Sequence, residues 1–160
     1  MKRIILTSAL LFGTLSAFSQ NKKDEKPLVP FTFSVMEKCL YLDIDTTIKI
    51  LSASGFVQNT DDKHIKEEAD KWKPNKIVIM NMEKEEIVIV YDRVSVTHLT
   101  LRSNSTSDKT GENFFTESLK AGYKETTQVT DKPRVSKNGK KDVKYNNANK
   151  PWTLEVSGKR

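Results

Sequence analysis

The sequence contains few side chains of the types that do catalytic or metal chemistry, and their spacing indicates other roles. His64 and His98 are the only two histidines, and they lie too far apart in the chain for the close ligand spacing of a zinc site. The segment Asp43-Ile44-Asp45-Thr46-Thr47 begins like a calcium-binding loop. However, Ile48 takes the place of the required glycine, and Ser54 takes that of the bidentate glutamate. We interpret these aspartates as helix caps and predict no metal and no cofactor.

Nucleophilic catalysis has little support in the sequence. There is no Gly-x-Ser-x-Gly motif, and the only cysteine, Cys39, lies in an apolar context that favours a buried thiol. His98 alternates in phase with Val96 and Thr100, which indicates a half-buried strand histidine. Residues far apart in a sequence can still meet in the fold. We therefore favour a non-catalytic protein and keep an enzyme that uses His98 as an alternative.

A basic β-hairpin is the remaining candidate for a binding site. Asn138-Gly139 is the strongest hairpin signal in the chain, because this pair favours a type I′ turn. Lysines flank the turn, and residues 109–160 contain 12 Lys and Arg against 6 Asp and Glu. Basic and aromatic side chains together can hold an anionic chain through charge contacts and stacking. The candidate partner-binding residues are Lys137, Lys140, Lys141, Arg134, Lys144, Tyr145 and Trp152.

Solubility is the simpler explanation of the same charges. Lysines at a hairpin tip stay solvated and discourage pairing with the strand edge of another chain. The formal net charge of +6 at pH 7 also suits an anionic partner, such as a cell-surface polymer, lipid headgroups or an acidic protein. Nucleic acid fits poorly because the N-terminus predicts export.

Residues 1–19 predict a signal peptide. Lys2 and Arg3 precede an apolar segment at 4–12, and Ala17-Phe18-Ser19 places small residues before a cleavage site. The apolar segment is shorter than the ~20 residues that a membrane-spanning helix needs. We expect a periplasmic or secreted protein that begins at Gln20, with residues 20–30 as a linker and no membrane span. A lone cysteine also leaves no internal disulfide.

Residues 76–102 are the centre of the predicted fold. Three segments rich in Val and Ile, at 77–82, 87–91 and 94–101, predict strands joined by two hairpins. Residues 77–80 and 87–90 do not alternate between apolar and polar, so both faces of these strands should be covered. Helices can cover one face, and the other needs a second module, another subunit or a partner. Residues 142–145 and 152–156 alternate cleanly, which predicts one solvated face.

Three helices are predicted at 35–41, 46–54 and 112–121. Ser34 and Glu37 fit a capping box for the first helix, and Asp43 or Asp45 can cap the second. Glycines at 55 and 122 end the second and third helices. Residues 60–73 predict a polar loop that carries a short exposed helix. Further strands are expected at 123–129, 134–137, 142–145 and 152–156.

The order helix, Gly-Phe or Gly-Tyr, meander occurs twice, at Gly55-Phe56 and at Gly122-Tyr123. With the segments MEKCLYLDIDTTIKILSASGF, ENFFTESLKAGYKE and WTLEV, the chain resembles a group of small exported bacterial proteins that share this order. The resemblance covers nearly the whole mature chain and implies an architecture but no activity. The layout is also similar to tandem β-lactamase-inhibitor-like modules and to small outer-membrane assembly lipoproteins. The lack of a lipidation cysteine departs from the lipoproteins, and a likeness of fold does not transfer function.

The sequence therefore predicts an α+β fold of two small modules, each with helices packed on an antiparallel β-meander. The modules would be residues 31–103 and 104–160, or the two would form one continuous domain. The leading functional prediction is an exported, soluble, non-catalytic binding or interaction protein that acts through its sheet surface or basic hairpin. An inhibitor or immunity-type protein directed at an enzyme is the alternative suggested by the layout. A protein, an anionic envelope polymer or a second copy of the chain is the expected partner.

Overall fold

A computed structural model describes residues 29–93, 95–103, 109–126, 133–148 and 151–159 of the chain. Within these ranges, four helices and one eight-stranded antiparallel sheet make an α+β fold, which confirms the predicted class. The helices are α1 (Phe33–Cys39), α2 (Ile44–Ala53), α3 (Asp62–Trp72) and α4 (Lys109–Lys120). The strands are β1 (Val57–Gln58), β2 (Lys76–Met82), β3 (Glu85–Asp92), β4 (Ser95–Ser103), β5 (Lys124–Glu125), β6 (Arg134–Asn138), β7 (Lys141–Asn146) and β8 (Trp152–Gly158).

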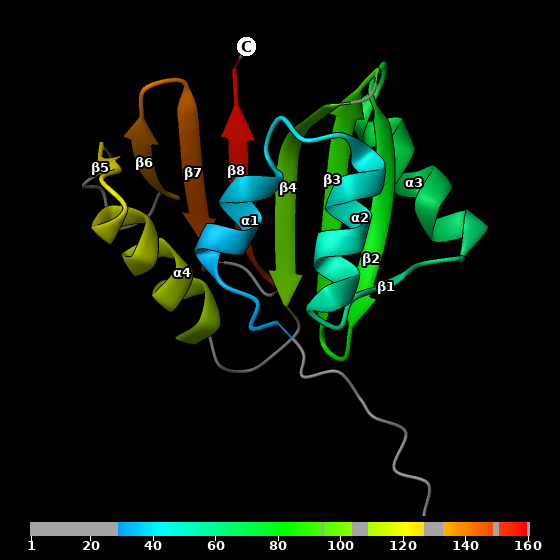
Figure 1. Ribbon diagram of the computed structural model, residues 1–160, viewed down its shortest axis with the longest axis horizontal. Helices are drawn as coiled ribbons and strands as arrows, with labels where there is room; N and C mark the ends of the chain where they lie inside the picture. Colours follow the sequence, from blue (N-terminus) through cyan, green and yellow to red (C-terminus); the bar gives the residue numbers. More distant parts are fainter. Residues whose placement is uncertain (1–28, 94, 104–108, 127–132, 149–150, 160) are drawn as a thin grey trace, which may run out of the picture.

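The sheet joins the two predicted meanders side by side. Its strand order is β1-β2-β3-β4-β8-β7-β6-β5, so β4 and β8, the last strands of the two meanders, pair at the centre (Figure 1). Each outer edge ends in a strand of only two residues, β1 or β5, which limits pairing with other chains. The two sets of strands thus form one continuous sheet, and the division of the chain into two modules stays a prediction.

The two halves repeat the same local signals. Gly55 follows α2 with φ +98° and Gly122 follows α4 with φ +91°, the left-handed backbone that glycine adopts without a Cβ clash. Asp43 caps α2 by accepting a hydrogen bond from the Thr46 backbone N–H at 2.8 Å. These three positions were predicted from the sequence.

The cap of α1 differs from the prediction. Thr32, not Ser34, is the N-cap, and it accepts a bond from the Val35 N–H at 3.4 Å. Glu37 does not reach back to the helix start. Its Oε1 accepts bonds from the Tyr123 hydroxyl at 2.8 Å and from the Lys141 ammonium at 2.9 Å. This carboxylate therefore connects α1 to the other half of the chain, and the helix begins two residues earlier than a Ser34 cap requires.

The main core lies between the sheet and the layer of α1, α2 and α4 (Figure 1). Alternate residues of β3, β4 and β8, including Ile89, Leu99 and Leu154, are fully buried there. Phe115 of α4 packs against them. Cys39 is buried in the same layer, and burial raises the pKa of its thiol to about 11. An inert, structural cysteine is the result.

The opposite face of β2 and β3 is covered by α3. A smaller core of Ile79, Val88 and Val90 packs there against Ile65 and Trp72 of the helix. Because α3 belongs to the same chain, the apolar second face of these strands needs no second subunit or partner. The sequence predicted a polar loop with a short exposed helix between residues 60 and 73; the helix is present, but it is longer than expected and one side of it packs on the sheet. The segment forms an eleven-residue helix that covers the second face of β2 and β3.

Candidate functional site

Among the described residues, no helix covers the second face of the sheet over β6, β7 and β8. Among the described helices, α3 packs on this face at β2, whereas α4 packs on the opposite face of β7 and β8. The uncovered surface is hollowed, with a cavity volume of about 340 Å³. We call it the open face, and its lining residues are Thr126, Val135, Lys137, Asp142, Lys144, Glu155 and Ser157.

Strand register arranges the polar side chains of the open face in rows. In one row, Lys137 of β6 lies opposite Asp142 of β7, which lies opposite Ser157 of β8. In the next row, Lys144 lies opposite Glu155. Directly opposed residues in an antiparallel pair have Cβ atoms ~4.5–5.5 Å apart, so each row forms a continuous strip of functional groups.

The charges of the open face balance. Two ammonium groups, from Lys137 and Lys144, accompany two carboxylates, from Asp142 and Glu155. Lys144 and Glu155 form a loose ion pair at 3.9 Å. Lys137 and Asp142 form none with any described residue, although they lie opposite each other. The hollow thus holds an ammonium and a carboxylate that are both available to a ligand.

His98 continues the first row into β4, opposite Ser157. Its ring packs on Trp72 of α3, with the ring centroids 5.6 Å apart. Burial lowers the pKa of His98; the nearby Glu155 carboxylate opposes this shift, while Lys144 adds to it. A neutral imidazole at pH 7 is the consequence.

The row His98, Ser157, Asp142 contains the residue types of a hydrolase but not its contacts. The ring nitrogen contact of His98 is to Thr97, between Nδ1 and Oγ1 at 3.1 Å. The carboxylate neighbours the serine across the strands and not the histidine. A serine nucleophile needs a base within hydrogen-bond reach, and that base needs an orienting partner. The alternative of an enzyme that uses His98 stays a hypothesis.

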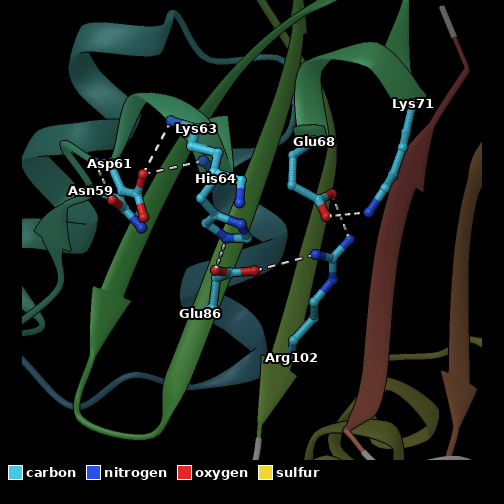
Figure 2. A network of polar contacts seen from close by, with 8 residues as sticks. All are labelled: Asn59, Asp61, Lys63, His64, Glu68, Lys71, Glu86 and Arg102. Atoms are coloured by element: carbon cyan, nitrogen blue, oxygen red, sulfur yellow. Dashed lines mark hydrogen bonds and ion pairs between the residues drawn. The ribbon is translucent and has the colours of Figure 1, made fainter. Parts of the chain in front are cut away.

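Beside the open face, a polar network fastens α3 to the sheet (Figure 2). Arg102 of β4 lies at its centre and donates to Glu68 of α3 at 2.9 Å and to Glu86 of β3 at 3.2 Å. Glu86 also contacts His64 of α3 at 2.6 Å, and Lys71 pairs with Glu68. Every charged group in the network has a partner, so this cluster holds α3 in place and leaves little for a ligand.

Glu68 is the buried member of this network, with 3% of its surface exposed. Burial alone would raise the pKa of its carboxyl, but hydrogen bonds and charge from Arg102 and Lys71 outweigh burial and lower the pKa to about 2. The carboxylate therefore stays ionised over the whole physiological range of pH.

The seven candidate residues predicted from the sequence do not form one surface. Lys137 and Lys144 line the hollow, and Lys140 is exposed at the hairpin turn. Lys141 pairs with Glu37 on the helix-covered face, at 2.9 Å. Arg134 lies on that face too, 4.2 Å above the Phe115 ring and 2.7 Å from a carboxylate oxygen of Glu112.

The two aromatic candidates lie in the core. Tyr145 is 1% exposed and Trp152 is 2% exposed, so neither ring is available for stacking on a ligand. The alternation of β7 and β8 already indicated this, because Tyr145 is in phase with the apolar Val143 and out of phase with Lys144. The same alternation could have identified the lining residues of the hollow on β7 and β8 that were not predicted: Asp142, Glu155 and Ser157.

No three His, Cys, Asp or Glu side chains of the described residues come together in a way that could hold a metal ion. None of the described helices combines the length and apolar character needed to cross a membrane. Comparisons of the chain with known protein families, with curated proteins and with solved structures found no match. The group of exported proteins that the sequence resembles therefore stays a prediction.

Proposed function

We propose that this chain is a non-catalytic binding protein whose ligand lies on the open face. The observation that carries this proposal is the polar hollow over β6–β8, in which Lys137 and Asp142 pair with no other described residue. A volume of about 340 Å³ falls within the range of small-ligand pockets, ~300–1,000 Å³. Sheet strands form the floor, so the groups that would meet a ligand are held on rigid elements.

The apolar strands β2 and β3 are not a candidate binding surface. Ile79 and Val90 have no exposed surface to offer, because α3 covers them. The basic hairpin is also a weaker candidate than expected, since Lys141 is neutralised by Glu37. Of the two surfaces predicted from the sequence, the sheet face is the better supported.

Export belongs to this proposal as well. Residues 1–28 lie outside the described part of the chain, so the signal peptide and most of the linker rest on the sequence alone. A protein of the periplasm or extracellular space is what the N-terminal pattern favours. An inhibitor or immunity-type protein stays a hypothesis, because the structure adds no feature in its favour.

A ligand panel followed by NMR tests the proposal. The mature chain, labelled with ¹⁵N, is titrated with amino acids, dipeptides, monosaccharides and heparin fragments. We expect amide shifts concentrated at Lys137, Asp142 and Ser157 for at least one small probe. The variant Ser157→Arg, which fills the hollow with a solvated side chain, should abolish these shifts.

The matched control is Lys140→Glu, which changes a charge at the hairpin turn outside the hollow. This variant should bind like the unmodified chain. Shifts that fall outside the open face for every probe, or a Ser157→Arg variant that binds normally, would contradict the proposal.

A further inference from the structure

The charges of the hollow carry an inference about the chemistry of the ligand. We propose that the open face binds a small zwitterion, in the charge class of a free amino acid or a dipeptide. The ligand carboxylate would lie at Lys137 and the ligand ammonium at Asp142. This inference rests on the proposed function and deepens it.

Charge balance argues against the anionic polymer expected from the sequence. The basic excess of residues 109–160 does not reach the hollow, where two lysines face two carboxylates. An extended polyanion laid across β6–β8 would gain no net attraction, because repulsion from Asp142 and Glu155 offsets attraction to the two lysines. A ligand that carries both charges can satisfy both kinds of group at once.

The separation of the two free groups fits a small molecule. Lys137 and Asp142 face each other across β6 and β7, so their Cβ atoms are about 5 Å apart. They do not bond to each other or to other described residues, whereas Lys144 is already paired with Glu155. The Ser157 hydroxyl lies next to Asp142 in the same row and can hydrogen-bond to a ligand ammonium or amide.

The size of the hollow also favours a small ligand. A volume of about 340 Å³ is near the lower end of the ligand-pocket range, which suits a molecule of a few residues at most. The described lining residues are mostly polar or charged and form no apolar wall, so specificity must come from charge complementarity.

Three dipeptide probes separate the two charges experimentally. Glycylglycine carries both charges, N-acetylglycylglycine only the carboxylate, and glycylglycinamide only the ammonium. The labelled mature chain is titrated with each probe at pH 7 and followed by NMR. We expect glycylglycine to bind at least tenfold more tightly than either derivative, with shifts at Lys137, Asp142 and Ser157.

Variants assign each charge to a residue. Lys137→Gln should remove the advantage of glycylglycine over glycylglycinamide, and Asp142→Asn should remove its advantage over N-acetylglycylglycine. The exchange Lys137→Asp with Asp142→Lys keeps both charges in the hollow, so it should retain glycylglycine binding within a few-fold. Lys137→Asp alone should lose it, and Lys140→Gln should change nothing.

Two results would overturn the inference and can be told apart. If N-acetylglycylglycine binds the hollow as tightly as glycylglycine, the site is an anion site; the zwitterion assignment is wrong, and the proposed binding function stands. If neither the dipeptides nor the wider panel shifts any residue of the open face, the inference and the proposed function both fail.

Discussion

The two halves of the sheet differ in how many of their faces are apolar and covered by helices. In the half built from β2 and β3, both faces are apolar and both are buried, one under α2 and its neighbours and one under α3. In the half built from β6, β7 and β8, one face is apolar and packed against α4, and the other is polar and has no described helix over it. The comparison shows that the sequence pattern of a strand records how many of its faces are covered.

The two halves also differ in whether their charged side chains form ion pairs. On the covered half, every charged group of the network around Arg102 is paired, and Glu68 is buried because Arg102 and Lys71 satisfy it. On the open half, Lys137 and Asp142 face each other without pairing. The paired charges hold α3 on the sheet, while the unpaired charges in the hollow remain available to a ligand. The following predictions test this contrast, beginning with the largest effect.

The same substitution should destabilise the covered half of this face strongly and the open half only slightly. Val88→Asp places a carboxylate in the dry core beneath α3, and we expect a loss of more than about 4 kcal/mol in the free energy of unfolding. Val135→Asp lies on the open face beside lysines, and we expect a change within about 1 kcal/mol. Urea denaturation of both variants measures the difference. Equal destabilisation would show that the open face is covered in solution.

The buried carboxylate of α3 should matter more than its exposed neighbour. Glu68→Gln leaves Arg102 without its closest charged partner, and we expect a loss of about 2 kcal/mol in unfolding free energy. Glu67→Gln is the matched control, because Glu67 has a side chain 60% exposed and a weak pair at 4.0 Å with Lys63. A Glu68→Gln variant as stable as Glu67→Gln would show that packing alone holds α3.

Lowering the pH should weaken the packing of α3 on the sheet. The pKa of Glu68 falls from an ordinary 4.5 in the unfolded chain to about 2 in the fold. Its contribution to stability is therefore complete above pH 4.5 and is lost progressively as the pH falls toward 2. Hydrogen exchange between pH 5 and pH 3 should show weakening protection in α3 and β2. In Glu68→Gln this extra pH dependence should disappear; an unchanged profile would assign it to other carboxylates.

The smallest effects on stability are expected for the free charges of the open face. Lys137→Gln and Asp142→Asn should each change the unfolding free energy by less than about 0.5 kcal/mol, because neither group pairs with another described residue. Thermal denaturation measures this directly. A clear loss of stability in either variant would mean that these side chains are structural, and the contrast between the two halves would disappear.

Much of the architecture could be predicted from local patterns. Strands β2, β3, β7 and β8, the left-handed glycines at 55 and 122, and the solvated face of β7 and β8 all follow from short-range signals. Helix α3 was underestimated because its sequence is mostly charged. Its buried side is small, with Ile65, Trp72 and the paired Glu68, and a buried glutamate cannot be foreseen without its distant arginine.

The candidate site was only partly predictable. Lys137 and Lys144 were selected for their charge and lie in the hollow, but proximity in sequence also selected Arg134 and Lys141, whose side chains point to the other face. Strand alternation separates these groups once the strand bounds are known. Ser157 could not be linked to His98 from the sequence, because that neighbourhood depends on the pairing of β4 with β8.

By itself, the sequence determined which strands have one apolar face and which have two, since the alternation of side chains along a strand is a local property. It also determined where α2 and α4 end, because glycine adopts the left-handed backbone at little cost. Only the tertiary structure decided that α3 covers the second face of β2 and β3, and that a hollow of balanced charge remains over β6–β8. Both depend on long-range register and packing, which bring together residues that no short stretch of sequence contains.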